Sequence, residues 1–277
     1  MAAWRDLGVN SLAMKRTLPL VLALFVSVMT ASAQDWAKQS LDKSPRHSEW
    51  VTLKHDNRSL QVFVVYPEVK SKAPAVIVIH EIFGLTDWAR SAADELAAAG
   101  YIAVEPDLLS GSGPNGAGTG SFSSSQDAIK AVSGLDPAVV TADLDAAADY
   151  AKKLPAANGK IAVAGFCWGG SQSFRFATNR HDLSAAFVFY GTAPPDISAI
   201  NAPVYGFYGG NDARVDATVP DTVAAMKQAG KKYDPVTYDG AGHGFMRAGE
   251  DPGNANPANA TARTQAWERW KSLLKSM

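Results

Sequence analysis

The chain is poor in cysteine, since its 277 residues include only Cys167. No disulfide can form within the chain, and a redox cycle would lack a resolving cysteine, so the thiol is left for other chemistry. The net charge of −1 gives no electrostatic reason to expect nucleic acid as a partner. The Gly- and Ser-rich segment Ser110–Ser125 lacks the Gly-Lys-Ser/Thr ending of a phosphate-binding loop, which argues against nucleotide binding.

Metal-binding motifs are absent as well. His80-Glu81 begins like the zinc motif H-E-x-x-H, but position 84 is Gly and no second histidine follows. A zinc site built on this pair would lack ligands. The sequence therefore predicts no metal and no other cofactor.

The apolar run near the N-terminus is too short for a membrane span. Leu18–Met29 falls below the ~20 residues that a helix needs to cross a bilayer. It follows the basic stretch Met14-Lys15-Arg16 and precedes Ala31-Ser32-Ala33, an A-x-A cleavage site. These three features together predict a secretory signal peptide that is cleaved after Ala33.

This signal predicts how the chain is organised and where it is located. Residues 1–33 form the signal peptide, with translation starting at Met1 or Met14, and residues 34–277 form one domain. We expect a periplasmic or secreted monomer with no stable membrane insertion after cleavage. An uncleaved membrane anchor is the alternative.

The later chain alternates between short apolar runs and helical patterns. This alternation predicts the α/β class, with a mostly parallel central sheet and helices on both faces. The Ser110–Ser125 segment is either an active-site lid or a loose surface loop, and Gly249–Pro257 is expected to be a surface connection. The expected strands are Leu60–Tyr66, Ala75–Ile79, Tyr101–Glu105, Ile161–Ala164, Ala185–Tyr190, Val204–Tyr208 and Val236–Tyr238, and the expected helices are Trp88–Ala99, Val139–Leu154, Gly170–Thr178, Val219–Ala229 and Ala260–Lys275.

The single cysteine lies in the frame Gly165-Phe166-Cys167-Trp168-Gly169-Gly170. A β-rich run precedes it and a helical run follows, so the sequence predicts a strand, a sharp turn and a helix, the arrangement of a nucleophile elbow. The flanking glycines permit the strained turn, and the N-terminus of the following helix favours the thiolate. A small buried cysteine is the alternative, but packing alone does not explain the glycine frame.

An acid and a histidine follow the cysteine in the order typical of α/β-hydrolases. Asp212 comes after the strand Val204–Tyr208 and a Gly-Gly turn, and His243 lies in a glycine-rich loop after the strand Val236–Tyr238. We expect His243 to accept the proton of Cys167 and to deliver it to the leaving group. Asp212 would hold the tautomer of the imidazole.

The loop after the strand Ala75–Ile79 is expected to supply half of an oxyanion hole. The backbone N–H groups of Ile82 and Trp168 would converge on the developing oxyanion. Glu81 lies at the carboxyl end of the same strand, opposite the predicted elbow. Its alternative role is that of a surface carboxylate.

Four segments together resemble the dienelactone hydrolases, a family within the α/β-hydrolase superfamily that includes carboxymethylenebutenolidase. The similarity runs from about Val62 to Leu274 and is carried by His80–Leu85, Val104–Leu108, Gly165–Gly170 and Ala241–Phe245. The resemblance implies an α/β-hydrolase fold with a catalytic triad made of Cys167, His243 and Asp212. It also implies a switch, in which Glu81 holds the resting thiol until substrate displaces it.

The resemblance is weaker for the substrate. The family typically hydrolyses the ring ester of 4-carboxymethylenebut-2-en-4-olide and uses arginines to bind its carboxylate, and Arg247 matches one of them. The other arginine has no evident counterpart, because Gly111–Gln126 contains no arginine. A family tyrosine of the same pocket is replaced here by Ile129. The resemblance therefore supports the family's catalytic chemistry for this chain more strongly than it supports the family's substrate.

Aromatic side chains are further candidates for substrate binding. Trp88, Trp168 and Phe245 could form an apolar wall beside the scissile bond, and Tyr190, which ends an expected strand, is a fourth candidate. The alternative is that they are core aromatics, which for Trp88 is the favoured interpretation.

These patterns favour an exported hydrolase that cleaves small esters or lactones through an acyl-Cys167 intermediate. The expected partner is therefore a small-molecule ester or lactone, with no nucleic acid. A general carboxylesterase for aromatic or bulky esters is the first alternative. A secreted binding protein that has kept the fold without turnover is the second.

Overall fold

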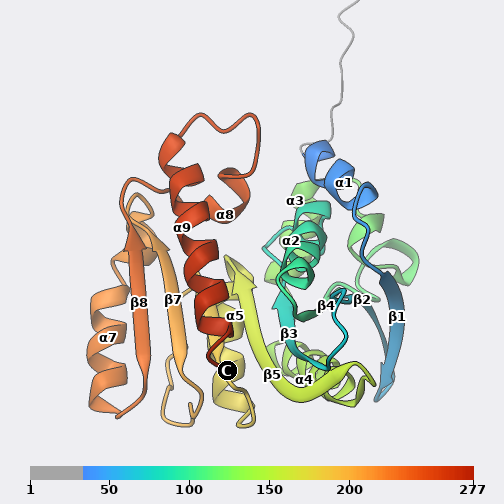
Figure 1. Ribbon diagram of the computed structural model, residues 1–277, viewed down its shortest axis with the longest axis horizontal. Coiled ribbons are helices and arrows are strands. Elements are labelled where there is room, and N and C mark those ends of the chain that lie inside the picture. The colour runs from blue at the N-terminus through green and yellow to red at the C-terminus, as the bar shows by residue number, and fades with distance from the viewer. Residues whose placement is uncertain (1–33) are drawn as a thin grey trace, which may run out of the picture. The chain divides into compact units, whose positions relative to one another are not determined.

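A single mixed sheet organises the part of the chain that the computed structural model describes, residues 34–277. The expected signal peptide and both candidate starts lie outside these described residues. Figure 1 shows the strands side by side, with the long strand β5 near the middle. The eight strands within residues 34–277 are β1 (Ser48–His55), β2 (Arg58–Val65), β3 (Ala73–Ile79), β4 (Ile102–Pro106), β5 (Ala157–Phe166), β6 (Ala186–Phe189), β7 (Val204–Gly209) and β8 (Tyr233–Tyr238).

The strand order is β1-β2-β4-β3-β5-β6-β7-β8. Strand β2 pairs antiparallel with β1 and β4, whereas every pairing from β4 to β8 is parallel. The central strands are buried on both sides, as their runs of Val, Ile, Ala and Phe predict. Because these strands are parallel, their carboxyl ends meet at one edge of the sheet. The loops that hold the candidate site residues emerge at that edge.

Helices cover both faces of the sheet, which confirms the predicted class. One face packs against α1 (Asp35–Asp42), α2 (Asp87–Ala98), α8 (Phe245–Ala248) and α9 (Pro257–Leu274), and the other packs against α4 (Pro137–Lys153), α5 (Trp168–Asn179) and α7 (Val219–Gln228). The remaining elements are α3 (Ser125–Ser133), α6 (Ala213–Asp216) and the 3₁₀ turns η1 (Pro114–Gly116) and η2 (Thr119–Ser121). None of the helices in residues 34–277 is both long and apolar enough to cross a membrane.

The differences from the sequence-based expectations lie mainly at the edges of the fold. The expected strands and helices are present with ends shifted by a few residues, but β1, α1, α3 and the short helices α6 and α8 were not expected. Strand β1 alternates between exposed and half-buried residues and includes no fully buried one, so its apolar signal is weak. It is ordered by its antiparallel pairing with β2.

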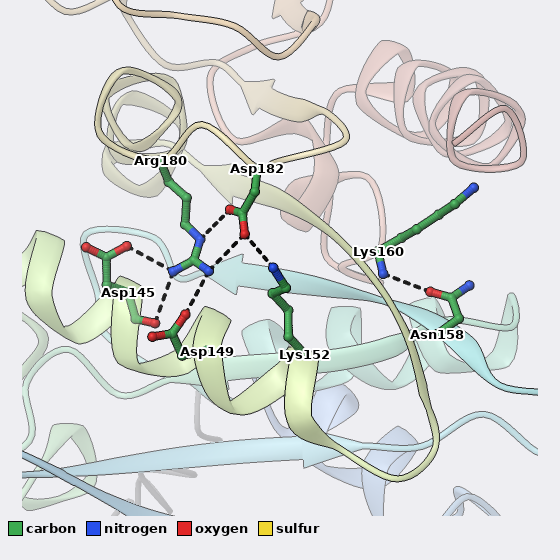
Figure 2. Close-up of polar contacts among 7 residues, drawn as sticks. All are labelled: Asp145, Asp149, Lys152, Asn158, Lys160, Arg180 and Asp182. Atoms are coloured by element: carbon green, nitrogen blue, oxygen red, sulfur yellow. Dashed lines mark hydrogen bonds and ion pairs between the residues drawn. The ribbon is translucent and has the colours of Figure 1, made fainter.

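An ion-pair network ties α4 to the loop that follows α5 (Figure 2). The guanidinium of Arg180 binds Asp182 at 2.7 Å, Asp149 at 2.8 Å and Asp145 at 3.2 Å. Lys152 reaches Asp182 from the last turn of α4 at 2.6 Å. The Arg180 side chain is only 11% exposed, whereas Lys152 is 38% exposed. Arg180 is therefore the centre of this network.

We predict that Arg180→Met lowers the free energy of unfolding by about 1–2 kcal/mol, because three carboxylates lose a largely buried partner. Lys152→Met, the control, should cost about 0.5 kcal/mol or less because both members of its pair are exposed. The hydrogen bond from Arg180 lowers the pKa of Asp182 to about 2. The stabilisation is therefore present above the ordinary value of about 3.9 and is lost as pH falls toward 2.

Urea denaturation at pH 7, 4 and 3 measures both effects. The gap between wild type and Arg180→Met should narrow as the pH falls. Equal losses in the Arg180 and Lys152 variants at pH 7 would contradict the central role of Arg180.

Candidate active site

Cys167 occupies a strained turn between β5 and α5. Its φ of 57° and ψ of −118° lie in a region that side chains rarely adopt, and its N–H donates to the carbonyl oxygen of Phe189 at 3.0 Å. The flanking glycines permit this turn. A Cβ on Gly165 would lie 2.0 Å from the carbonyl oxygen of Gly169, and a Cβ on Gly169 would lie 2.4 Å from that of His80. The predicted elbow is thus the geometry that this segment adopts.

The structure brings Cys167, His243 and Asp212 together from three loops at the carboxyl edge of the sheet. The sulfur of Cys167 lies 3.1 Å from Nε2 of His243, and Nδ1 of His243 lies 2.5 Å from Oδ2 of Asp212. Burial by itself lowers the pKa of His243, but the contacts with Cys167 and Asp212 outweigh it and raise that pKa to about 9. The geometry therefore favours an imidazolium that faces the sulfur on one side and a carboxylate on the other.

The loop that carries His243 is held from below by α9. Gly242 donates its N–H to Oδ1 of Asn259 at 2.9 Å, and Asn259 is itself buried. The imidazole packs edge-on against Tyr190, with 5.1 Å between the ring centroids. Sequence reasoning missed Asn259, because its side chain meets the histidine loop only once α9 has packed against the sheet.

Two backbone N–H groups are available near the sulfur. Ile82 and Trp168 both line the cavity that contains Cys167, and neither N–H donates to an acceptor among residues 34–277. The Trp168 N–H is free because this residue begins α5. The indole of Trp168 stacks on the buried imidazole of His80, with centroids 5.7 Å apart. These are the two donors that the sequence predicted for an oxyanion hole.

The loop that carries Ile82 is anchored by the Ser-rich segment. Oγ1 of Thr119 donates to Asp107 at 2.7 Å and accepts the N–H of Leu85 at 3.0 Å. Asp107 also accepts the N–H of Thr119 at 2.8 Å. No residue of Ser110–Ser125 lines the Cys167 cavity. In this structure the segment supports the loop that carries Ile82 and does not cover the sulfur.

Glu81 is buried and binds Arg247, not Cys167. The Nε of Arg247 donates to Oε2 of Glu81 at 2.8 Å, and within the described chain no hydrogen bond joins Glu81 to the sulfur. Burial raises the pKa of Glu81, and the charge of Arg247 partly opposes that shift. Burial, together with the nearby charges of Glu81 and Cys167, raises the pKa of Tyr190 well above its usual value. The charges of Glu81 and Cys167 thus both act on Tyr190.

A cavity of about 310 Å³ opens beside the sulfur. Apolar side chains, small hydroxyls and one arginine line it. Sequence reasoning missed four of the lining residues, although Arg214 and Val215 lie only two and three residues after Asp212. The lining residues are Ile82, Cys167, Trp168, Ser171, Tyr190, Thr192, Arg214 and Val215.

Of the four predicted substrate-binding residues, one lines the cavity and three do not. Tyr190 lines the cavity, whereas Arg247 does not, because Glu81 engages it. Phe245 is fully buried beneath Tyr190. Trp88 is 1% exposed and donates its Nε1–H to Glu250 at 3.0 Å. Phe245 and Trp88 therefore belong to the core, which is the interpretation favoured for Trp88, and neither keeps its alternative role in substrate contact.

The acidic and histidine side chains near the site do not form a metal-binding cluster. Within residues 34–277, no group of three or more His, Cys, Asp or Glu side chains is arranged to hold a metal ion. The chemistry available to the site residues is covalent attack by sulfur, proton transfer by imidazole and hydrogen bonding from two backbone N–H groups.

Comparisons with known proteins agree on one family. The family model described as "Dienelactone hydrolase family" matches residues 60–277. A "Putative carboxymethylenebutenolidase" of Methylorubrum extorquens is 30% identical and covers 95% of this chain and 97% of that relative. A protein of the same name from Salmonella typhimurium is 32% identical over 73% of this chain and 76% of its own. The crystal structure of a dienelactone hydrolase-like promiscuous phosphotriesterase from metagenomic libraries matches with a TM-score of 0.70 at 26% identity, covering 83% of this chain and 98% of that one.

Proposed function

The chain belongs to the dienelactone hydrolase family and is a hydrolase of that type, and on this premise we propose that it cleaves small carboxylic esters or lactones through an acyl-enzyme on Cys167. Its fold is the α/β-hydrolase fold. The observation that carries the proposal is the chain of contacts from the Cys167 sulfur through His243 to Asp212. The cavity of about 310 Å³ beside the sulfur lies at the lower end of the volumes typical of small-molecule sites, which favours a small substrate.

Acylation would begin with attack of the Cys167 thiolate on the ester carbonyl carbon. The carbonyl oxygen becomes an oxyanion that the N–H groups of Ile82 and Trp168 would stabilise, at about 3 kcal/mol for each donor. As the tetrahedral intermediate collapses, His243 gives its Nε2 proton to the departing alkoxide. The products of this step are the free alcohol, or the opened ring of a lactone, and a thioester on Cys167.

Deacylation would use the same groups in reverse. Nε2 of His243, now neutral, accepts a proton from water while the oxygen of that water attacks the thioester carbon. The thiolate leaves, the acid is released and the imidazolium is restored. Asp212 accepts the Nδ1–H throughout, which keeps Nε2 directed at the sulfur.

We predict that Cys167→Ala lowers kcat for p-nitrophenyl acetate by about a thousandfold or more, because no acyl-enzyme can form. Mass spectrometry of the wild-type enzyme after rapid quenching should find one acetyl group on Cys167. A crystal structure of a trapped adduct should place its carbonyl oxygen about 3 Å from the N–H groups of Ile82 and Trp168. His181→Asn, at an exposed histidine, is the control and should retain activity. Esterase activity in Cys167→Ala would overturn the assignment of the nucleophile.

The raised pKa of His243 predicts a pH dependence that varies with the leaving group. The imidazolium is present below about pH 9 and is lost above it, since the contacts raise this pKa from its usual value of 6.5. Phenolate leaves poorly without a proton, whereas p-nitrophenolate leaves as a stable anion. Above pH 9, kcat/KM for phenyl acetate should therefore fall by about tenfold per pH unit, and more steeply than for p-nitrophenyl acetate. Parallel profiles for the two esters would contradict proton donation by His243.

Glu81 is proposed to control the charge state of the site through its own carboxylate. Removing that charge in Glu81→Gln takes a negative group away from the surroundings that Tyr190 shares with the sulfur. Glu81→Gln should therefore change the pH dependence of Cys167 alkylation by iodoacetamide. Glu95→Gln, which disrupts a different carboxylate–arginine pair away from the site, is the control. An unchanged alkylation profile in Glu81→Gln would exclude this role.

A further inference from the structure

His80 is a fully buried histidine that the proposed mechanism does not use. It directly follows β3, and its Nδ1 lies 2.8 Å from the carbonyl oxygen of Glu81, the next residue. Because a carbonyl oxygen can only accept, Nδ1 carries the proton and donates it. Burial lowers the pKa of His80, so the imidazole is neutral. Its Nε2 is then an acceptor, and it has no partner among residues 34–277.

The hydrogen bond from His80 fixes the orientation of the peptide group that follows Glu81. The C=O of Glu81 and the N–H of Ile82 belong to one planar trans peptide, so these two bonds point in opposite directions. While His80 holds the carbonyl oxygen, the N–H of Ile82 is directed away from the imidazole, and Ile82 lines the cavity beside Cys167. The N–H of Gly84 donates to the same carbonyl oxygen at the longer distance of 3.2 Å. The imidazole is therefore the closer of two donors that hold this peptide.

The same side chain contacts the residue that supplies the second N–H group. The imidazole of His80 stacks on the indole of Trp168, with the ring planes 15° apart and the centroids 5.7 Å apart. The main chain of His80 is close to α5 as well, since a Cβ on Gly169 would lie 2.4 Å from its carbonyl oxygen. One buried residue thus contacts both segments that carry the expected oxyanion-hole donors.

We propose that His80 is a positioning residue, which directs the Ile82 N–H at the oxyanion of the reaction by holding the Glu81 carbonyl oxygen and which supports Trp168 with its ring. This inference rests on the proposed hydrolase function. His80 itself is buried and does not line the cavity, so it does not touch the substrate. Its effect belongs to the transition state, in which the ester carbonyl oxygen gains charge, and not to binding of the neutral ester.

Two substitutions separate the hydrogen bond from the packing of the ring. His80→Leu removes the donor and keeps a similar volume, whereas His80→Asn loses the ring but places an amide N–H₂ near the position of Nδ1. With p-nitrophenyl acetate, His80→Leu should lower kcat and kcat/KM by the same factor, about thirtyfold, because a donor used only in the transition state is misdirected. His80→Asn should stay within about fivefold of wild type.

His55→Leu is the matched control. Nε2 of His55 lies 2.7 Å from Oδ1 of Asp143, and His55 is on β1, outside the cavity, so its loss should change kcat by less than about twofold. Alkylation of Cys167 by iodoacetamide forms no oxyanion, and its rate should change by less than about twofold in every variant. If His80→Leu does not fold, His80→Phe makes the same test with a ring retained against Trp168.

Three results would overturn the proposal. The first is a kcat for the variant without the donor that is within about twofold of wild type. The second is an equal loss in His80→Asn, and the third is a loss accompanied by slower alkylation, since the thiol itself would then be disturbed. Failure of the hydrolase function would appear instead as no turnover by the wild type. A crystal structure of His80→Leu would then still test His80, because an unchanged Glu81–Ile82 peptide would show that the imidazole does not hold it.

Discussion

The close approach of three backbone segments at the cysteine turn constrains everything else in this site. Cys167 takes a positive φ, and the first turn of α5 passes so near β3 that a Cβ on Gly169 would touch the carbonyl oxygens of Ile79 and His80. This contact holds the start of α5 against the loop that carries Ile82. Ile82 and Trp168, from distant parts of the chain, therefore line one cavity, and a larger residue at Gly169 would push them apart.

The electrostatics of the site follow from that placement. Because the turn lifts the sulfur above the sheet, His243, in the loop after β8, can reach it through Nε2. Asp212 binds the other ring nitrogen, Nδ1. The imidazole is partly buried, which disfavours its charge, yet two acceptors compensate and its pKa rises to about 9. A histidine that stays protonated at neutral pH is suited to hold a thiolate and to protonate a leaving group.

The sequence predicted the parts of the site whose geometry is determined by a short segment of the chain. A glycine frame, a strand before it and a helix after it are sufficient to predict the turn at Cys167, and the order of Asp212 and His243 places each on a loop at one edge of the sheet. Side-chain partners across long separations were not predictable in this way. The Glu81–Arg247 pair spans 166 residues, and nothing in either segment indicates that Glu81 binds an arginine rather than the sulfur. Strand β1 was missed because an edge strand that is half exposed carries little apolar signal.

The two arginines at this edge of the sheet show why a family motif does not by itself determine a substrate. Arg247 keeps the motif position after His243, but it binds a buried carboxylate that lost its water on folding and needs a positive partner. Releasing Arg247 to bind substrate would leave Glu81 unpaired in the interior. Arg214 differs, because none of the described residues binds its side chain and it lines the cavity beside Cys167. A motif position therefore identifies an arginine without making it free to bind a substrate anion.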